Sequence, residues 1–241
     1  MAVSFGISTD IPTPGDFDGD GKTDIALFRP ATGEWYRLNS SNGVFLGLQF
    51  GANGDIPEAG DFDGDLKDDI AVWRASNGTW YSLNSSNGRS ISVNFGQNGD
   101  QPVGGDYDGD GRDDLSVFRP SNGIWYRLNS NTSTFVSIAF GVSTDMAVPA
   151  DYDGDNRDDI CVFRPSNGSW YRLNSSNGQF AAVNFGQNGD VPAPGDYDGD
   201  GRDDQAVFRN GTWFILRSTA GFTSMGFGIG SDVPIPKKYI P

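Results

Sequence analysis

The stretch DFDGDGKTD, residues 16–24, decides the fold of this chain. Four close copies of it begin at residues 61, 106, 151 and 196, so the acidic segment returns every 45 residues. Each copy crowds at least four aspartates into nine positions, where like charges repel one another. Such a segment is either a solvated acidic turn or a loop that closes around a cation.

Other features keep the same period. A tryptophan-containing segment follows each loop, as in EWYRLNSSNG (34–43) and SWYRLNSSNG (169–178), and a Phe-Gly pair ends each unit. Residues 11–17, 24–29, 34–39 and 44–50 of the first unit are rich in β-forming residues and are expected to be strands. Turn residues separate these segments, and no helix signal is present.

Four strands in a repeat of this length are typical of a β-propeller blade. We therefore predict an all-β fold, a five-bladed β-propeller of four-stranded antiparallel blades. It would form a single domain over residues 1–241, with repeats that start near residues 12, 57, 102, 147 and 192. Segments 5–14 and 227–236 are copies of each other, so residues 227–241 hold an extra terminal strand. We expect one copy to close the ring and the other to be frayed or packed outside.

The composition excludes several classes of function. A net charge of -15 and a pI near 4.1 argue against a nucleic-acid partner, and no apolar run is long enough for membrane insertion. The chain has no histidine, one cysteine (Cys161) and two glutamates, Glu34 and Glu58, neither of which belongs to a group that breaks the repeat. No Ser-His or Cys-His nucleophile is possible. We therefore expect no enzyme.

The acidic loops have the ligands of a calcium site. Counted from Asp16 as position 1, carboxylates fall at positions 1, 3, 5 and 9, and the Lys or Arg at position 7 can offer its backbone carbonyl. An oxygen-only set of this size and charge suits Ca2+, which accepts six to eight oxygens in flexible geometry. We predict up to five Ca2+ ions, one per blade, on the following residues: Asp16, Asp18, Asp20, Lys22, Asp24; Asp61, Asp63, Asp65, Lys67, Asp69; Asp106, Asp108, Asp110, Arg112, Asp114; Asp151, Asp153, Asp155, Arg157, Asp159; Asp196, Asp198, Asp200, Arg202, Asp204.

An EF-hand and a solvated acidic turn are the two alternatives to such a site. An EF-hand needs a bidentate Glu at position 12, but this position is apolar in every copy, from Leu27 in the first loop to Val207 in the last. A solvated turn without a counter-ion would leave the aspartates at separations of about 4–6 Å, at a cost of kilocalories per loop. We therefore expect the ions to be structural, so that chelation lowers the melting temperature.

The Phe-Gly pairs, the PTPGD or PAPGD stretches and the pattern D-x-D-x-D-G-x-x-D together resemble the FG-GAP (VCBS-type) repeats of integrin alpha-subunit propellers and many secreted bacterial proteins. The resemblance covers essentially the whole chain. It implies that each loop joins the first and second strands of a blade and binds Ca2+. At position 6, Gly is replaced by Leu66 and Asn156. Leu adopts a left-handed backbone less readily than Asn, so the second loop departs furthest from the pattern. The C-terminal segment PIPKKYIP lacks an acidic loop and is expected to bind no metal.

Two further sets of residues recur once per repeat. Five tryptophans either pack between blades, which we favour, or present rings on which a sugar stacks: Trp35, Trp80, Trp125, Trp170 and Trp213. Five arginines precede the same turn and are expected to pair with the six recurring aspartates of the loops before the first strands: Arg29, Arg74, Arg119, Arg164 and Arg209, with Asp10, Asp55, Asp100, Asp145, Asp190 and Asp232. We expect these pairs to link neighbouring blades.

Two hypotheses for function remain. The first is a non-catalytic, calcium-stabilised recognition module that binds glycans or extracellular proteins, in which several weak sites gain by multivalency. The second is a purely structural or engineered repeat scaffold whose sole activity is calcium binding. The start MAVSFG is not a signal peptide. We expect a secreted or cell-surface protein of bacterial type whose signal has been removed, and the oligomeric state stays open.

Overall fold

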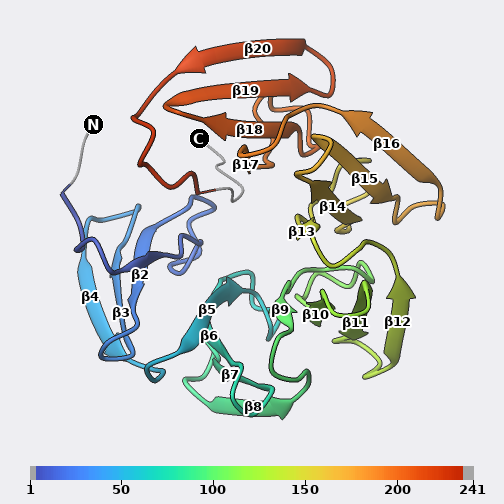
Figure 1. The fold of residues 1–241 in the computed structure, drawn as a ribbon. Coiled ribbons are helices and arrows are strands. Elements are labelled where there is room, and N and C mark those ends of the chain that lie inside the picture. The colour runs from blue at the N-terminus through green and yellow to red at the C-terminus, as the bar shows by residue number, and fades with distance from the viewer. Residues whose placement is uncertain (1–3, 236–241) are drawn as a thin grey trace. The chain divides into compact units, whose positions relative to one another are not determined.

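The computed structural model describes residues 4–235, which contain strands and turns but no helix (Figure 1). Within that range there is accordingly no helix that could cross a membrane. The strands form five four-stranded antiparallel sheets, in which each strand pairs with its neighbours in sequence. These sheets are the blades of a β-propeller. The predicted fold class, a five-bladed β-propeller, is confirmed.

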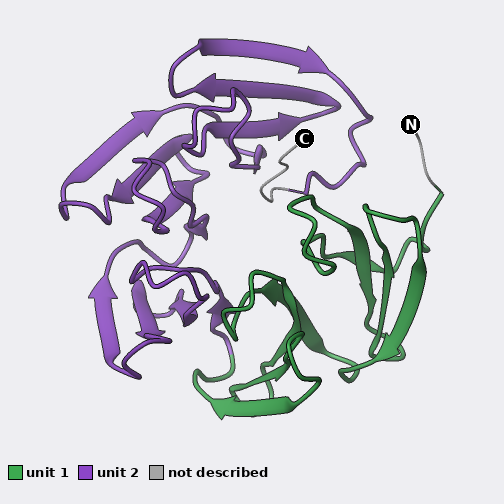
Figure 2. Ribbon diagram, turned by 180° about the vertical axis from the view of Figure 1, so that it is seen from behind, with its two compact units in different colours: residues 1–98, 240–241 green, residues 99–239 purple. Residues whose placement is uncertain are grey.

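The chain divides into two compact units (Figure 2). The first unit holds blades 1 and 2. Blade 1 consists of β1 (Ile11–Pro12), β2 (Ile25–Arg29), β3 (Glu34–Leu38) and β4 (Phe45–Gln49). Blade 2 consists of β5 (Asp55–Gly60), β6 (Asp69–Arg74), β7 (Thr79–Leu83) and β8 (Ser90–Asn94).

The second unit holds blades 3, 4 and 5. Blade 3 consists of β9 (Gln101–Pro102), β10 (Leu115–Arg119), β11 (Ile124–Leu128) and β12 (Phe135–Ala139). Blade 4 consists of β13 (Met146–Ala147), β14 (Ile160–Arg164), β15 (Ser169–Leu173) and β16 (Phe180–Asn184). Blade 5 consists of β17 (Val191–Pro192), β18 (Gln205–Arg209), β19 (Thr212–Arg217) and β20 (Gly221–Gly226).

The first strand of most blades is shorter than the sequence predicts. In blade 1 the ladder ends at Pro12, and an isolated bridge between Gly15 and Asp24 restores the pairing beyond it. Pro14 lies in the gap, and proline has no N–H to donate to a ladder. Blade 2 has Ala59 at the equivalent position, and there the pairing continues through Ala59 and Ile70 to Gly60. Blades 4 and 5 likewise have Pro149 and Pro194 in the gap, but blade 3 is interrupted in the same way with Gly104 there, so proline is not the sole cause of the break.

The two copies of the terminal segment behave differently. In the N-terminal copy, Ile11 and Pro12 pair with Phe28 and Leu27 of the same blade. In the C-terminal copy, residues 227–235 form no strand, and the remainder of the predicted extra strand lies outside the described residues. The PIPKKYIP segment, for which no metal is predicted, also lies largely outside them.

The hydrophobic core lies between adjacent blades. One cluster joins Phe28 and Trp35 of blade 1 to Ile70 and Val72 of blade 2. Corresponding clusters join blade 3 to blade 4 and blade 4 to blade 5. The second strands are the most buried, because both of their faces are covered, whereas every residue of β4 is exposed. A single blade could not bury its apolar face alone, which is why blades stack.

The recurring arginines and aspartates do form ion pairs, but within blades. Arg74 in β6 lies directly opposite Asp55 in β5 and donates two hydrogen bonds to its carboxylate, at 2.7 and 2.8 Å. The guanidinium also lies 4.6 Å from the centre of the Tyr81 ring. The same bidentate pair occurs in all five blades. The expected link between blades is wrong, because each aspartate lies in or directly before the first strand of the same blade as its arginine. Among the described residues, no arginine pairs with Asp232, the sixth copy.

Candidate metal centres

Position 1 of each acidic loop organises the loop backbone. The Asp16 carboxylate accepts hydrogen bonds from the N–H groups of Gly19 at 2.7 Å, Asp20 at 3.2 Å and Gly21 at 2.8 Å. The equivalent bonds recur in the other four loops. The turn is thus closed by the side chain that begins it.

Position 6 needs a left-handed backbone. Gly21 has φ 80°, and the replacements Leu66 and Asn156 have φ 68° and 61°. A residue other than Gly, Asn or Asp adopts this region at a cost of roughly 1–2 kcal/mol. Leu66 is nevertheless held there, with its N–H 2.8 Å from Asp61 Oδ2 and its side chain 81% exposed. The second loop therefore has the same shape as the others and carries backbone strain that they lack.

The turn after the third strand closes over the acidic loop. Ser40 Oγ donates to Asp20 at 2.9 Å, and Ser41 Oγ donates to Asp18 at 2.6 Å. Blades 2 and 4 repeat both bonds with serines, and blade 5 uses Ser218 and Thr219. These hydroxyls were missed in the sequence, although the recurring Ser-Ser pair offered a signal. They orient the carboxylates of positions 3 and 5.

Position 9 is buried in every loop. Asp24 is 1% exposed and accepts hydrogen bonds from the N–H groups of Ser40 at 2.6 Å and Phe17 at 3.1 Å. Burial raises the pKa of this carboxyl in all five loops, to about 6 for Asp69 and Asp114. The charge at position 3 raises these pKa values further. A cation beside the group would offset both effects.

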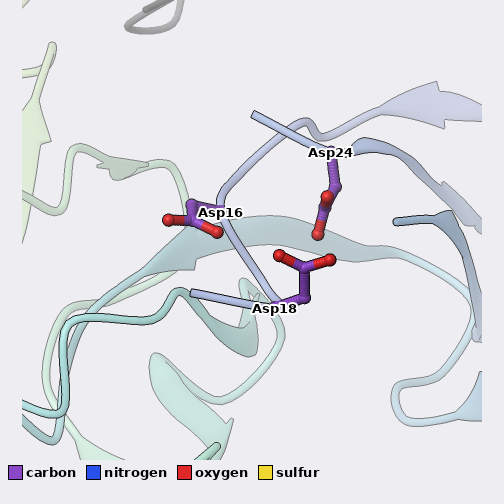
Figure 3. A group of neighbouring side chains, drawn as sticks. All are labelled: Asp16, Asp18 and Asp24. Carbon is purple, nitrogen blue, oxygen red and sulfur yellow. The ribbon is translucent and has the colours of Figure 1, made fainter. Parts of the chain in front are cut away.

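Carboxylate oxygens converge in every loop. Figure 3 shows the carboxyl groups of Asp18 and Asp24 facing each other with Asp16 beside them. One oxygen from each of three aspartates lies within 4.8 Å of the others in each group: Asp16, Asp18, Asp24; Asp61, Asp63, Asp69; Asp106, Asp108, Asp110; Asp151, Asp153, Asp159; and Asp196, Asp198, Asp204. Ca2+ binds oxygen at 2.3–2.6 Å, so two of its ligands are at most about 5 Å apart. The spacing fits calcium.

An unpaired oxygen at position 3 supplies a second test of whether the loops suit a bound cation. The Oδ1 atoms of Asp63, Asp108, Asp153 and Asp198 are buried and accept no hydrogen bond. In the first loop, Asp18 Oδ1 accepts one bond of 3.2 Å from Asp20. A buried carboxylate oxygen without a partner is costly. Its recurrence within the oxygen clusters is what a bound cation would explain.

The remaining predicted ligands lie at the edge of the clusters. In four loops the position 5 carboxylate is outside the group of converging oxygens and instead accepts hydrogen bonds from a hydroxyl and from the N–H of position 7. In the third loop Asp110 belongs to the cluster, and Asp114 does not. The N–H groups of Lys22, Lys67, Arg112, Arg157 and Arg202 donate to the position 5 carboxylates at 2.9–3.1 Å.

Position 8 joins neighbouring loops within each unit. Asp68 accepts a hydrogen bond from the N–H of Asp16 at 2.9 Å, and its own N–H donates to the Asp16 carbonyl at 2.8 Å. Asp203 does the same to Asp151, and the N–H of Asp158 donates to the Asp106 carbonyl. This two-bond junction was missed in the sequence, although position 8 is Asp in four loops and Thr23 in the first.

The recurring tryptophans are packing residues in this structure. Trp35, Trp80, Trp125 and Trp170 are 2–3% exposed, and Trp213 is half-buried. The indole of Trp35 donates to the Phe50 carbonyl at 2.9 Å, and all but Trp80 repeat this bond. In blade 2, Trp73 donates to the corresponding carbonyl instead. The four buried rings have almost no exposed surface, which favours packing over the stacking of a sugar at these positions.

Comparisons with known proteins agree with this architecture. A family model described as FG-GAP-like repeat matches residues 16–72, 106–162 and 151–207. No curated protein matches this chain significantly.

Solved structures give likenesses at low identity. A streptogramin B lyase has a TM-score of 0.61 at 13% identity over 93% of this chain and 71% of the lyase. A catalytically inactive virginiamycin B lyase from Staphylococcus aureus, bound to quinupristin, has a TM-score of 0.59 at 12% identity over 97% and 90%. A lectin from Agrocybe aegerita that recognises non-reducing terminal N-acetylglucosamine has a TM-score of 0.62 at 16% identity over 90% and 66%. At such identities these likenesses concern the fold alone. The matched repeats extend over more than half of the chain, which therefore belongs to the family of FG-GAP-like repeat proteins.

Proposed function

We propose that each acidic loop binds one Ca2+ ion and that the calcium-stabilised propeller is a non-catalytic recognition module for glycans or extracellular proteins. The recurring unpaired oxygen at position 3, inside a cluster of converging carboxylates, carries the calcium proposal. The ion would be held by the residues of positions 1, 3 and 9, with Asp110 in place of position 9 in the third loop. It would supply the positive charge that these buried groups lack.

Exposed polar turns support the recognition role. The turns between the second and third strands expose residues 31–32, 76–77, 121–122 and 166–167. Their amide groups are positioned by the strand beside them, since Asn77 and Asn122 donate to the hydroxyls of Tyr81 and Tyr126 at 3.0 and 2.9 Å. Equivalent polar turns on successive blades suit a multivalent ligand. A glycan has this repetitive character, and the Agrocybe aegerita lectin offers an analogy in fold.

Catalysis is a weaker proposal. The staphylococcal lyase structure is of a histidine-to-alanine variant that is catalytically inactive, and this chain has no histidine. Its carboxylates recur with the repeat rather than forming one exceptional pair. We therefore propose a binding protein, and with it an extracellular or cell-surface location, where calcium at about 10⁻⁴–10⁻³ M affinity would be retained.

Calcium titration followed by a glycan array tests both parts. Isothermal titration calorimetry of EDTA-treated protein should give five sites, and calcium should raise the melting temperature by about 10 °C or more. Array binding should then appear in calcium and disappear in EDTA. A melting curve that calcium leaves unchanged would refute the metal sites. Five calcium sites with no glycan or protein ligand would favour the structural scaffold.

A further inference from the structure

A cavity of about 540 Å³ lies between blades 1 and 2, both in the first unit. Leu46 and Leu48 of β4 line one side, and Ile70 and Leu83 of blade 2 line the other. Leu46 and Leu48 are 40% and 41% exposed, so the apolar wall is open to solvent. A volume of this size is in the range of small-molecule sites.

The equivalent place between blades 3 and 4 is almost closed. There the cavity lined by Val136, Ile138 and Ile160 has a volume of about 10 Å³. Phe180 begins β16 in that pair of blades, stacks on Tyr171 with ring centres 6.2 Å apart, and meets the edge of Phe140 at 6.3 Å. A phenyl ring from one blade therefore covers the boundary with the preceding blade.

Blade 2 lacks this phenyl ring. Its residue at the same register is Ser90, which lies opposite Leu83 just as Phe180 lies opposite Leu173. Residues directly opposite on neighbouring strands share one face of a sheet, and Leu83 faces the cavity. Each of the other four blades has Phe at this register: Phe45, Phe135, Phe180 and Phe222. We attribute the larger cavity in part to this single missing side chain.

Two cations with spare hydrogen-bonding capacity line the same cavity, Arg37 and Lys67. Arg37 makes one long bond of 3.4 Å, to the Phe17 carbonyl. Among residues 4–235 no carboxylate lies within ion-pair distance of either cation. Their counterparts in the second unit are engaged: Arg127 bonds to Asn129 at 2.7 Å, and Arg157 pairs with Asp155.

The two carboxylates that line the cavity already accept hydrogen bonds from the protein. Asp68 accepts the N–H of Asp16, and Asp18 accepts the Ser41 hydroxyl and belongs to the first oxygen cluster. Hydrogen bonding leaves both carboxylates charged, so the balance rests on the calcium proposed above for the first loop. That ion would offset the charge of Asp18 and leave Arg37, Lys67 and Asp68 with a net positive charge over an apolar floor. Arginine and lysine donors suit a carboxylate, and the missing phenyl ring leaves room for an aromatic ring.

We propose that the cavity between blades 1 and 2 binds one small aromatic carboxylate, with its ring against Leu46, Leu48 and Leu83 and its carboxylate toward Arg37 and Lys67. This site is distinct from the exposed turns proposed for glycans and does not depend on them. It occurs once in the first unit rather than once per blade.

A set of three probes tests the proposal on calcium-saturated protein. Calorimetric or NMR titration should show one bound 3-phenylpropanoate per chain, about tenfold tighter than 3-phenylpropanamide, because a charged acceptor strengthens each hydrogen bond. The corresponding amine, 3-phenylpropylamine, should bind most weakly. Equal affinity for the three probes, or tightest binding of the amine, would overturn the assignment of an anionic ligand.

Substitutions locate the binding. Ser90→Phe restores the residue that four blades carry, so it should fold, keep its calcium stoichiometry and bind the acid at least about tenfold less tightly. Leu46→Trp fills the cavity from its exposed wall and should act likewise. Arg37→Gln should remove the preference for acid over amide, and Arg37→Lys should retain part of it. Undiminished binding in both filled variants would refute the site.

The second unit offers a gain-of-function control. Phe180→Ser removes an exposed ring and should open a second cavity between blades 3 and 4, so that two probe molecules bind. The new cavity should not prefer the acid, because Arg127 and Arg157 are engaged there. If Phe180→Ser adds no binding, the missing ring is not what creates the site.

Discussion

The second and third acidic loops have nearly the same sequence and reach the same backbone shape by different means. Loop 2 places Leu66 at φ 68° where loop 3 places Gly111 at φ 82°. Loop 2 gathers the oxygens of positions 1, 3 and 9, whereas loop 3 gathers those of positions 1, 3 and 5. The loop shape is thus set by the position 1 carboxylate and its backbone bonds, and the details of the cluster are set by the neighbouring strands.

A nearby arginine distinguishes the two clusters. Arg127 Nε lies 3.7 Å from Asp114 Oδ2 in blade 3, and the equivalent residue in blade 2 is Ser82. In blade 3 the position 9 carboxylate therefore has a cation from the protein. In blade 2, Asp69 has none among the residues that the structure describes. This difference can be tested directly.

The largest effect is expected from removing single carboxylates. Asp69→Asn should reduce the calcium stoichiometry from five to four, whereas Asp114→Asn should retain five sites, because Asp114 lies outside its oxygen cluster. The converse should hold at position 5, where Asp110→Asn removes a site and Asp65→Asn does not. Calorimetric titration of the four variants measures this. Equal losses at both positions in both loops would show that the two clusters are alike.

A moderate effect is expected from pH. In calcium-free protein the pKa of Asp69 and Asp114 is raised from 3.8 to about 6. Between about pH 4 and pH 6 the folded state then binds more protons than the unfolded state, so these two groups make the free energy of unfolding fall as pH rises. Bound calcium needs ionised ligands, so calcium-loaded protein should gain stability over the same range.

Urea unfolding at pH 4.5 and pH 6.5, with calcium or with EDTA, measures this reversal. In EDTA, Asp69→Asn and Asp114→Asn should flatten the pH dependence equally, because burial raises both pKa values to the same extent. The same slope in calcium and in EDTA would count against metal binding at these loops.

The smallest effect is expected at position 6. Leu66→Gly relieves a left-handed leucine that is 81% exposed, so little packing is lost. The free energy of unfolding should rise by about 1 kcal/mol, once the greater flexibility of glycine in the unfolded chain is subtracted. The melting temperature should rise by about 2–4 °C. Gly111→Leu should lose a similar amount, as measured by calorimetry. A neutral result in both directions would mean that the loop relaxes around either residue.

Much of the fold could be predicted from the repeat. The 45-residue period indicates the five blades, and the unusual residues at position 6 mark the left-handed backbone. The predicted ion pair between Arg74 and Asp55 is present, but the spacing of the two residues in the sequence does not show whether such a pair lies within a blade or between blades. Register in the antiparallel pair of β5 and β6 decides that question.

Other features arise from contacts between residues of different repeats, which the sequence of a single repeat does not show. Trp35 could have been a sugar platform or a packing residue, and only the burial by blade 2 distinguishes them. The role of Asp68 follows from its contact with Asp16, 52 residues away. The cavity beside Ser90 arises from an absent side chain, which appears in the sequence as an ordinary polar strand residue.

The junction made by Asp68 has a consequence for how such chains grow. Asp68 attaches blade 2 to the preceding blade, and the next residue, Asp69, belongs to blade 2's own carboxylate cluster. A duplicated segment of one repeat length carries the attachment and the cluster together. An added blade therefore arrives with the hydrogen bonds that attach it to the preceding blade already encoded. Two consecutive aspartates thus allow the chain to lengthen by whole repeats, because one attaches the new blade and the other belongs to its carboxylate cluster.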